Sequence, residues 1–224
     1  MMYRKLTRGF GLLILLAMSA SPSLAMEDEI QGLMLIIEQR LEDPAARQEA
    51  MRAGRNRALL CSYCHGNDGN SVKPDVPNLA GQNPVYLLDQ IGKFARGERK
   101  NFVMNSLAKD FTLDDKVNLA IYFARQTVKA RPQDEALAAS GKRLYAQRCV
   151  GCHGERGHGT AEYARLAGQR PAYLRLTLER FRAYDRGEQQ AAENVRRSPI
   201  MESIAARLSD ENIEVLAAYL AGLE

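Results

Sequence analysis

Apolar residues recur at helical spacing in this chain, and no stretch alternates between apolar and polar positions as a half-buried strand would. Two stretches place apolar side chains at positions i, i+4 and i+7, so that each set lies along one face of a helix. These sets are Leu87, Ile91 and Phe94, and Leu174, Leu178 and Phe181. The pattern predicts an all-α fold.

Helix-start signals mark further boundaries. Asp43 followed by Pro44 is typical of an N-cap and a first-turn proline, and predicts a helix that runs into Cys61. Thr112 and Ser209 each precede an acidic turn and an apolar run, so each is expected to open a helix.

The chain also repeats itself. Leu79-Ala-Gly-Gln82 recurs 87 positions later as Leu166-Ala-Gly-Gln169, whereas Met104 recurs 97 positions later as Met201. The larger offset places about ten extra residues in the second copy, within residues 184–199. Two domains are therefore expected, at residues 51–130 and 133–224, joined near Pro132.

Composition narrows the class of protein. The chain has 224 residues, 46% hydrophobic and 26% charged, as in ordinary globular proteins. Three of the charges behind its net +4 are Arg4, Lys5 and Arg8, so the remainder is nearly neutral. A near-neutral body argues against nucleic acid as a partner.

Residues 1–25 have the pattern of a secretory signal peptide. The basic residues precede an apolar run of about 12 residues, and Ser23-Leu-Ala25 follows as a small-x-small cleavage site. The run is shorter than the roughly 20 residues that span a bilayer. We expect export to the periplasm with cleavage after Ala25; an uncleaved membrane anchor is the alternative.

Each copy carries Cys-x-x-Cys-His, the attachment pattern for a c-type haem. Two thiols at this spacing can form thioethers to one haem, and the adjoining histidine is then aimed at the iron. The motifs are Cys61-Ser-Tyr-Cys64-His65 and Cys149-Val-Gly-Cys152-His153. The sequence predicts two covalently bound haem c groups per chain.

A haem held in this way needs a sixth ligand. Met104 and Met201 are the methionines that follow the motif in their copies, and they occupy matched repeat positions. Methionine–histidine ligation closes both axial positions of the iron and favours electron transfer.

Other interpretations of these residues stay open. The cysteines of each motif could form disulfides, which leaves the adjoining histidines unexplained, or a zinc site, for which the histidine spacing is wrong. Either methionine could fill a gap in the core, but their matched positions favour ligands.

The repeated Cys-x-x-Cys-His-Gly, Leu-Ala-Gly-Gln, Tyr-Leu helix and methionine resemble the cytochrome c4 family of dihaem cytochromes over residues 50–222. The resemblance implies a tandem pair of class I cytochrome c domains related by a pseudo-twofold. It implies axial ligands His65 and Met104 for the first haem, and His153 and Met201 for the second. The haem subunit of flavocytochrome c sulfide dehydrogenase is similar.

This resemblance implies a carrier that moves electrons by Fe(III)/Fe(II) cycling, toward a membrane terminal oxidase. The expected partners are redox proteins: the oxidase, a bc1-type complex, or a flavoprotein subunit. The first alternative is the haem subunit of an oxidoreductase complex. A dihaem peroxidase-like enzyme is the second, against which two candidate methionine ligands and the short chain argue.

Three features depart from the family pattern. Residues 26–50 form an extension with an apolar helical stripe, expected to pack on the first domain; the alternative is a docking helix for a partner or a peripheral membrane contact. A prolyl carbonyl, from Pro74 or Pro77, is expected to accept the Nδ1–H of His65, whereas the second copy has Tyr163-Ala-Arg there. The insertion carries Arg186, Arg196 and Arg197, which are expected to face solvent among interleaved acids; the alternative is a basic face for an acidic partner or for the haem propionates.

Overall fold

The computed structural model describes residues 22–132, 134–187 and 196–224. Within these ranges the chain is helical and contains no strands, so the all-α prediction is confirmed. The segment expected to act as a signal peptide lies almost entirely outside the described residues. In the part of the chain that is described, no helix has the length and hydropathy needed to cross a membrane.

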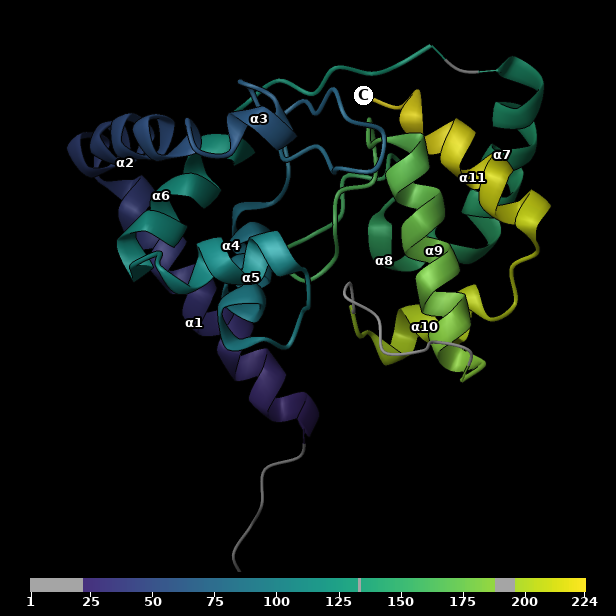
Figure 1. Cartoon of the computed structure of the whole chain (residues 1–224), viewed down its shortest axis with the longest axis horizontal. Helices are drawn as coiled ribbons and strands as arrows, with labels where there is room; N and C mark the ends of the chain where they lie inside the picture. Colours follow the sequence, from purple (N-terminus) through teal and green to yellow (C-terminus); the bar gives the residue numbers. More distant parts are fainter. Residues whose placement is uncertain (1–21, 133, 188–195) are drawn as a thin grey trace, which may run out of the picture.

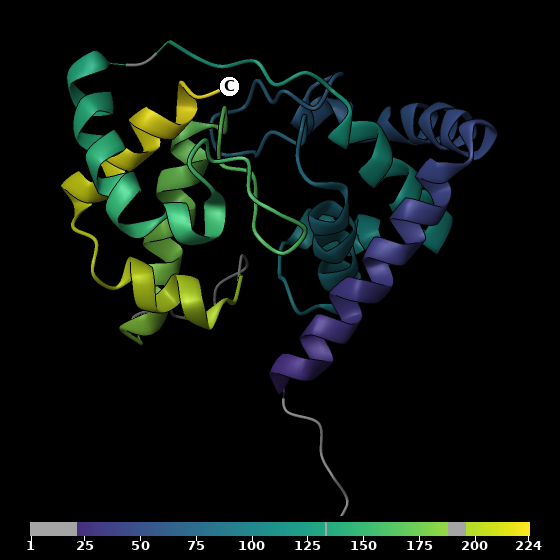
Figure 2. The same cartoon turned by 180° about the vertical axis from the view of Figure 1, so that it is seen from behind.

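The helices fall into two groups, which lie side by side in Figures 1 and 2. The first unit contains α1 (Pro22–Glu42), α2 (Pro44–Ala58), α3 (Ser62–His65), α4 (Pro84–Arg96), α5 (Phe102–Lys109) and α6 (Leu113–Ala124). The second unit contains α7 (Glu135–Arg148), α8 (Val150–His153), α9 (Pro171–Asp185), α10 (Pro199–Ala205) and α11 (Asp210–Ala221). The apolar stripes predicted from sequence lie on α4 and α9.

The expected helix starts are confirmed. The Asp43 carboxylate accepts the backbone N–H of Ala45 at 2.9 Å, and Pro44 occupies the first turn of α2. Thr112 opens α6 and Ser209 opens α11, each in a capping box in which the side chains at both ends of the first turn accept a backbone N–H.

In each unit the helix before the cysteine motif crosses the last helix at a glycine. A Cβ placed on Gly54 of α2 would lie 2.2 Å from the backbone oxygen of Asn118 on α6. A Cβ on Gly141 of α7 would lie 2.0 Å from the backbone oxygen of Val215 on α11. Both distances are far inside van der Waals contact, so the two crossings require glycine.

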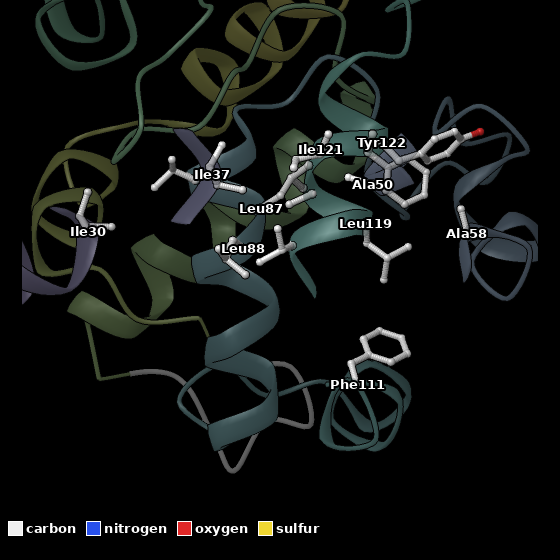
Figure 3. Close-up of a cluster of buried hydrophobic side chains, with 14 residues drawn as sticks. Ile30, Ile37, Ala50, Ala58, Leu87, Leu88, Phe111, Leu119, Ile121 and Tyr122 are labelled. Carbon is white, nitrogen blue, oxygen red and sulfur yellow. The ribbon is translucent and has the colours of Figure 1, made fainter. Parts of the chain in front are cut away.

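The N-terminal extension packs on the first unit. Helix α1 contacts α2, α4 and α6, and its Ile30 and Ile37 join the core cluster that includes Leu87 and Leu88 of α4 (Figure 3). This agrees with the expectation of a packed helix for residues 26–50. The core of the second unit is built from α7, α9 and α11 and the turn before α11, and the second copy has no matching extension.

Candidate functional site

Each Cys-x-x-Cys-His motif forms one helical turn. The backbone N–H of His65 donates to the carbonyl of Cys61 at 2.9 Å, and that of His153 donates to Cys149 at 3.0 Å. Residues three apart on a helix share a face, so the two thiols of a motif lie on the same side of the turn. All four cysteines are half-buried, and none is in a disulfide.

The first thiol of each motif is held in its neutral form by burial. Burial raises the pKa of Cys61 and of Cys149 to about 11. A neutral thiol is a weak nucleophile, so neither residue has the depressed pKa of a cysteine that reacts by disulfide exchange.

Both motif histidines are buried, with 7% and 8% of their surface exposed, and both are oriented by a backbone carbonyl. The Nδ1 atom of His65 lies 2.9 Å from the carbonyl oxygen of Pro77, and that of His153 lies 2.8 Å from Ala164. A carbonyl can only accept, so Nδ1 carries the proton and Nε2 keeps its lone pair.

Burial also lowers the pKa of His65 and of His153, so both rings are neutral at neutral pH. A neutral imidazole with a fixed tautomer is the form that ligates a metal, and the carbonyl partner sets its orientation. The expected prolyl acceptor in the first unit is Pro77. Ala164 supplies an equivalent bond in the second unit, so this contact does not depend on proline.

The two candidate methionine ligands occupy the same position on short helices. Met104 is the third residue of α5, and its N–H donates to the Asn101 side chain at 3.0 Å. Met201 is the third residue of α10, and its N–H donates to the Ser198 hydroxyl at 3.4 Å. Both are half-buried, and α5 and α10 pack on α4 and α9 respectively.

Two buried glutamines, one in each unit, hydrogen-bond to the backbone of the other unit. We call this pair of contacts the glutamine exchange. The Gln82 side chain accepts the N–H of Arg165 at 2.7 Å and donates to its carbonyl at 2.9 Å. The Gln169 side chain does the same to Asn78, at 2.7 and 3.1 Å. Gln82 and Gln169 are related by the repeat offset of 87, so the contact has pseudo-twofold symmetry.

A second exchange pairs arginines with tyrosines across the same interface. Arg99 of the first unit donates to the Tyr173 hydroxyl at 3.1 Å, and Arg196 of the second unit donates to the Tyr86 hydroxyl. Each guanidinium also lies over a phenylalanine of its own unit, Phe94 for Arg99 and Phe181 for Arg196.

Sequence reasoning missed this pair of contacts. The expectation that Arg196 faces solvent with the other arginines of the insertion is wrong, because its guanidinium packs at the interface. A signal existed: Arg196 follows Arg99 by 97 positions, the same offset that relates the two methionines. Arg197 and Arg182 pair with carboxylates of their own unit, Glu202 and Asp210.

Two helical units, each with a Cys-x-x-Cys-His turn and a neutral imidazole oriented by a carbonyl, define a c-type cytochrome. The cytochrome c family model matches residues 138–224. The chain belongs to the cytochrome c4 family. It is 36% identical over 181 residues to cytochrome c4 of Pseudomonas aeruginosa, which covers 76% of this chain and 87% of that relative.

Solved structures agree. The chain matches the reduced recombinant cytochrome c4 of Pseudomonas stutzeri with a TM-score of 0.67 and 33% identity, over 78% of this chain and 98% of that one. It is also 29% identical to a thiosulfate dehydrogenase electron acceptor of Thiomonas intermedia, over 73% of this chain and 78% of the relative. The protein is therefore an electron-transfer cytochrome with covalent haem c, built on class I cytochrome c folds.

Proposed function

We propose that this protein is a periplasmic electron carrier with two haems. Cys61 and Cys64 hold one haem and Cys149 and Cys152 hold the other. The observation that carries the proposal is the matched geometry of His65 and His153, each buried and each oriented by a carbonyl through Nδ1. The two histidines are the proximal ligands in domains spanning residues 51–130 and 133–224.

Met104 and Met201 are the second axial ligands of these haems. Their support is the equivalent place of both residues in the third position of α5 and α10. Haem c supplies one-electron Fe(III)/Fe(II) cycling when bound. The chain orients the imidazoles through fixed backbone acceptors, and the glutamine exchange holds the units in one arrangement.

The carrier works outside the cytoplasm, after cleavage following Ala25 or on an uncleaved anchor. Its electrons pass between a donor such as a bc1-type complex and a membrane terminal oxidase. The alternative is a subunit docked on an oxidoreductase. The relative named as a thiosulfate dehydrogenase electron acceptor favours an enzyme as donor in that case.

An optical titration tests the function. Protein matured in a host that attaches haem c is oxidised, reduced and then exposed to carbon monoxide. We expect two thioether-linked haems per chain and no spectral shift, because both irons are closed. One haem per chain, or carbon monoxide uptake by the unmodified protein, would contradict the proposal and favour an enzyme with an open iron.

The methionines are tested separately. Met104→Ala and Met201→Ala should each admit one carbon monoxide per chain and lower the reduction potential of one haem. The double variant should admit two. Met51→Ala, a partly buried methionine of α2 packed against the core, is the control and should admit none. A variant whose spectrum and potentials stay unchanged identifies a methionine that is not a ligand.

A further inference from the structure

Arg99 and Arg196 lie between the two units and occupy matched places in the repeat. Each stands five positions before a candidate methionine ligand. Each also packs over a phenylalanine of its own unit, with the guanidinium carbon 4.5 Å from the ring centre for Arg99 and 5.5 Å for Arg196. Both side chains are half-buried. The fold therefore places one cation of each unit at the interface, just before the helix that carries the methionine of that unit.

The partners of these two arginines differ from those of their neighbours in sequence. Arg96, in the last turn of α4, pairs with two glutamates, and Arg197 pairs with Glu202. Among the described residues, no carboxylate forms an ion pair with Arg99 or Arg196, and both donate to a tyrosine hydroxyl of the other unit. A cation held partly out of water is costly unless an anion pairs with it. The two guanidiniums are therefore suited to an anion that the described residues do not supply.

A third arginine adds to the positive charge of this interface. Burial lowers the pKa of Arg180 on α9, and the positive charge of Arg99 acts in the same direction. The charges of Asp75 and Glu179 act in the opposite direction, yet the pKa stays lowered. Arg99 and Arg180 therefore repel each other across the interface, and a bound anion would offset that repulsion.

The charges of the matched arginines also reach the motif histidines. Burial is the main cause of the lowered pKa of His65 and of His153. The positive charge of Arg99 contributes to the shift at His65, and that of Arg196 contributes at His153. Each arginine is therefore electrostatically close to the histidine of its own unit. The anion that pairs with it is expected from the haem attached in that unit.

Each arginine–tyrosine pair offers several hydrogen-bond donors. A guanidinium has five N–H groups, of which Arg99 gives one to Gln90 at 2.7 Å and one to the Tyr173 hydroxyl at 3.1 Å. A hydroxyl that accepts from an arginine keeps its own proton and can donate it to a further acceptor. Arg196 and Tyr86 form the same pair in the opposite direction across the interface. A guanidinium fork beside a hydroxyl matches a carboxylate, whose oxygens only accept.

We propose that these two arginine–tyrosine pairs are carboxylate sites, each for a propionate of the haem attached in the arginine's own unit. The proposal rests on the proposed function, because the carboxylates come with haem c. Each haem site then includes a tyrosine of the neighbouring unit. The arginine keeps its carboxylate ionised and offsets the negative charge, which favours Fe(II) over the more positive Fe(III).

Reduction potentials measured against pH test the proposal in the fully loaded protein. Between about pH 5 and pH 7 both potentials of the unmodified protein should change little, because the arginines keep the carboxylates ionised. Arg99→Gln leaves a carboxyl without its cation, and burial then raises the pKa of that carboxyl into this range. The potential of the first haem should therefore fall as the pH rises, while that of the second haem stays unchanged. Arg196→Gln should have the converse effect, and Met104→Ala assigns the two potentials because it should lower only the first.

Infrared spectra report the ionisation state directly. With carbon-13 in the propionate carboxyls, the unmodified protein at about pH 6 should show carboxylate bands only, and Arg99→Gln should add the band of a protonated carboxyl. Arg99→Lys keeps a cation at the same place and should not add that band. Tyr86→Phe removes a donor of the first unit and should alter the pH dependence and the carboxylate bands of the second haem alone.

Two arginines that already pair with carboxylates serve as controls. Arg96→Gln removes a charge three positions from Arg99 that glutamates of α1 and of the following turn neutralise. Arg175→Gln removes the partner of Glu214, whose carboxylate lies 2.9 Å away. Both variants should keep the potentials, the pH dependence and the infrared bands of the unmodified protein.

A structural role for the arginines predicts different results. Arg99→Gln and Arg196→Gln variants that are less stable, but keep ionised carboxylates and the pH dependence of the unmodified protein, would overturn the proposal. A new pH dependence that Arg96→Gln reproduces would overturn it as well, because loss of any nearby charge would then suffice. Unmodified protein with fewer than two attached haems would instead refute the proposed function.

Discussion

His65 in the first unit and His153 in the second donate to carbonyl oxygens at 2.9 and 2.8 Å, although the acceptors are a proline and an alanine. The glycine crossings and the glutamine exchange are matched in the same way. These shared contacts run through the backbone, which every residue carries. The two units can therefore differ in side chains and keep the same site geometry.

Their surfaces differ much more. The first unit is covered by α1 and exposes the large apolar side chains Leu59, Leu60, Tyr63 and Val72. The second unit has Gln147, Arg148, Gly151 and Thr160 at the positions 88 residues later. Surface residues do not orient the motif histidines, so they can differ between the units without changing the site geometry. The two units therefore share the contacts that orient their histidines and differ in the residues on their surfaces.

The largest effect on stability is expected at the two glycine crossings, which both units share. Gly54→Ala and Gly141→Ala should each lower the free energy of unfolding by about 3 kcal/mol, because the added Cβ overlaps backbone across the helix crossing. Denaturant unfolding followed by circular dichroism measures this. Gly32→Ala, where nothing lies within 4 Å, is the control and should raise stability by up to about 1 kcal/mol, because alanine is the better helix former. If only one of the two substitutions lowered the free energy of unfolding, the two crossings would not be equivalent.

The contribution of α1 should be confined to the first unit. Ile37 is 3% exposed, so Ile37→Ala should lower the stability of the first unit by about 2–4 kcal/mol. Amide exchange in α4 and α6 should accelerate while exchange in α9 and α11 stays unchanged. Leu35→Ala, on the same helix but exposed, should change stability by less than about 0.5 kcal/mol. Equal effects in both units would show that α1 stabilises more than its own unit.

The glutamine exchange predicts a matched pair of effects. Gln82→Ala and Gln169→Ala each leave an interface N–H and carbonyl without their side-chain partners, those of Arg165 and of Asn78 respectively, at a cost of about 1–3 kcal/mol. Hydrogen exchange is diagnostic: Gln82→Ala should expose the amide of Arg165, and Gln169→Ala that of Asn78. Gln31→Ala, on the exposed side of α1, should alter neither amide. If only one of the two substitutions accelerated exchange of its partner amide, the two glutamine contacts would not be equivalent.

The smallest expected effect is on pH dependence. Burial raises the pKa of Tyr173, but the charges of Arg99 and Arg196 and the Arg99 hydrogen bond outweigh it and bring the pKa to about 8. An unfolded tyrosine has a pKa near 10. Between about pH 8 and pH 10 the folded state has released a proton that the unfolded state retains, so stability rises with pH. The stability gained in this way is lost as the pH falls from about 10 through 8.

Urea unfolding at several pH values, with the Tyr173 resonance followed by NMR, measures this effect. Tyr173→Phe should abolish the added stability above pH 8. Tyr184→Phe is the control and should keep it, because Tyr184 contacts Arg197 and not Arg99. A Tyr173 resonance that titrates near pH 10 would contradict the cause assigned to the shift.

Sequence alone determined the parts of this protein that depend on neighbours along the chain. The helix stripes on α4 and α9, the caps at Asp43, Thr112 and Ser209, and the two motif turns all follow from residues within one or two turns of each other. The repeat offsets also related the two copies, because two units of the same fold bury residues at matched positions.

Only the tertiary structure decided which distant groups meet. Arg196 lies 110 positions from the tyrosine it contacts, and Gln169 lies 91 positions from Asn78. Such contacts depend on how whole helices pack, and a single sequence does not state which surfaces become an interface. The same reason separates Ile30 and Ile37 of α1, which are buried, from Leu59, Leu60 and Tyr63, which are exposed: all are apolar in the sequence, and only packing buries the first two.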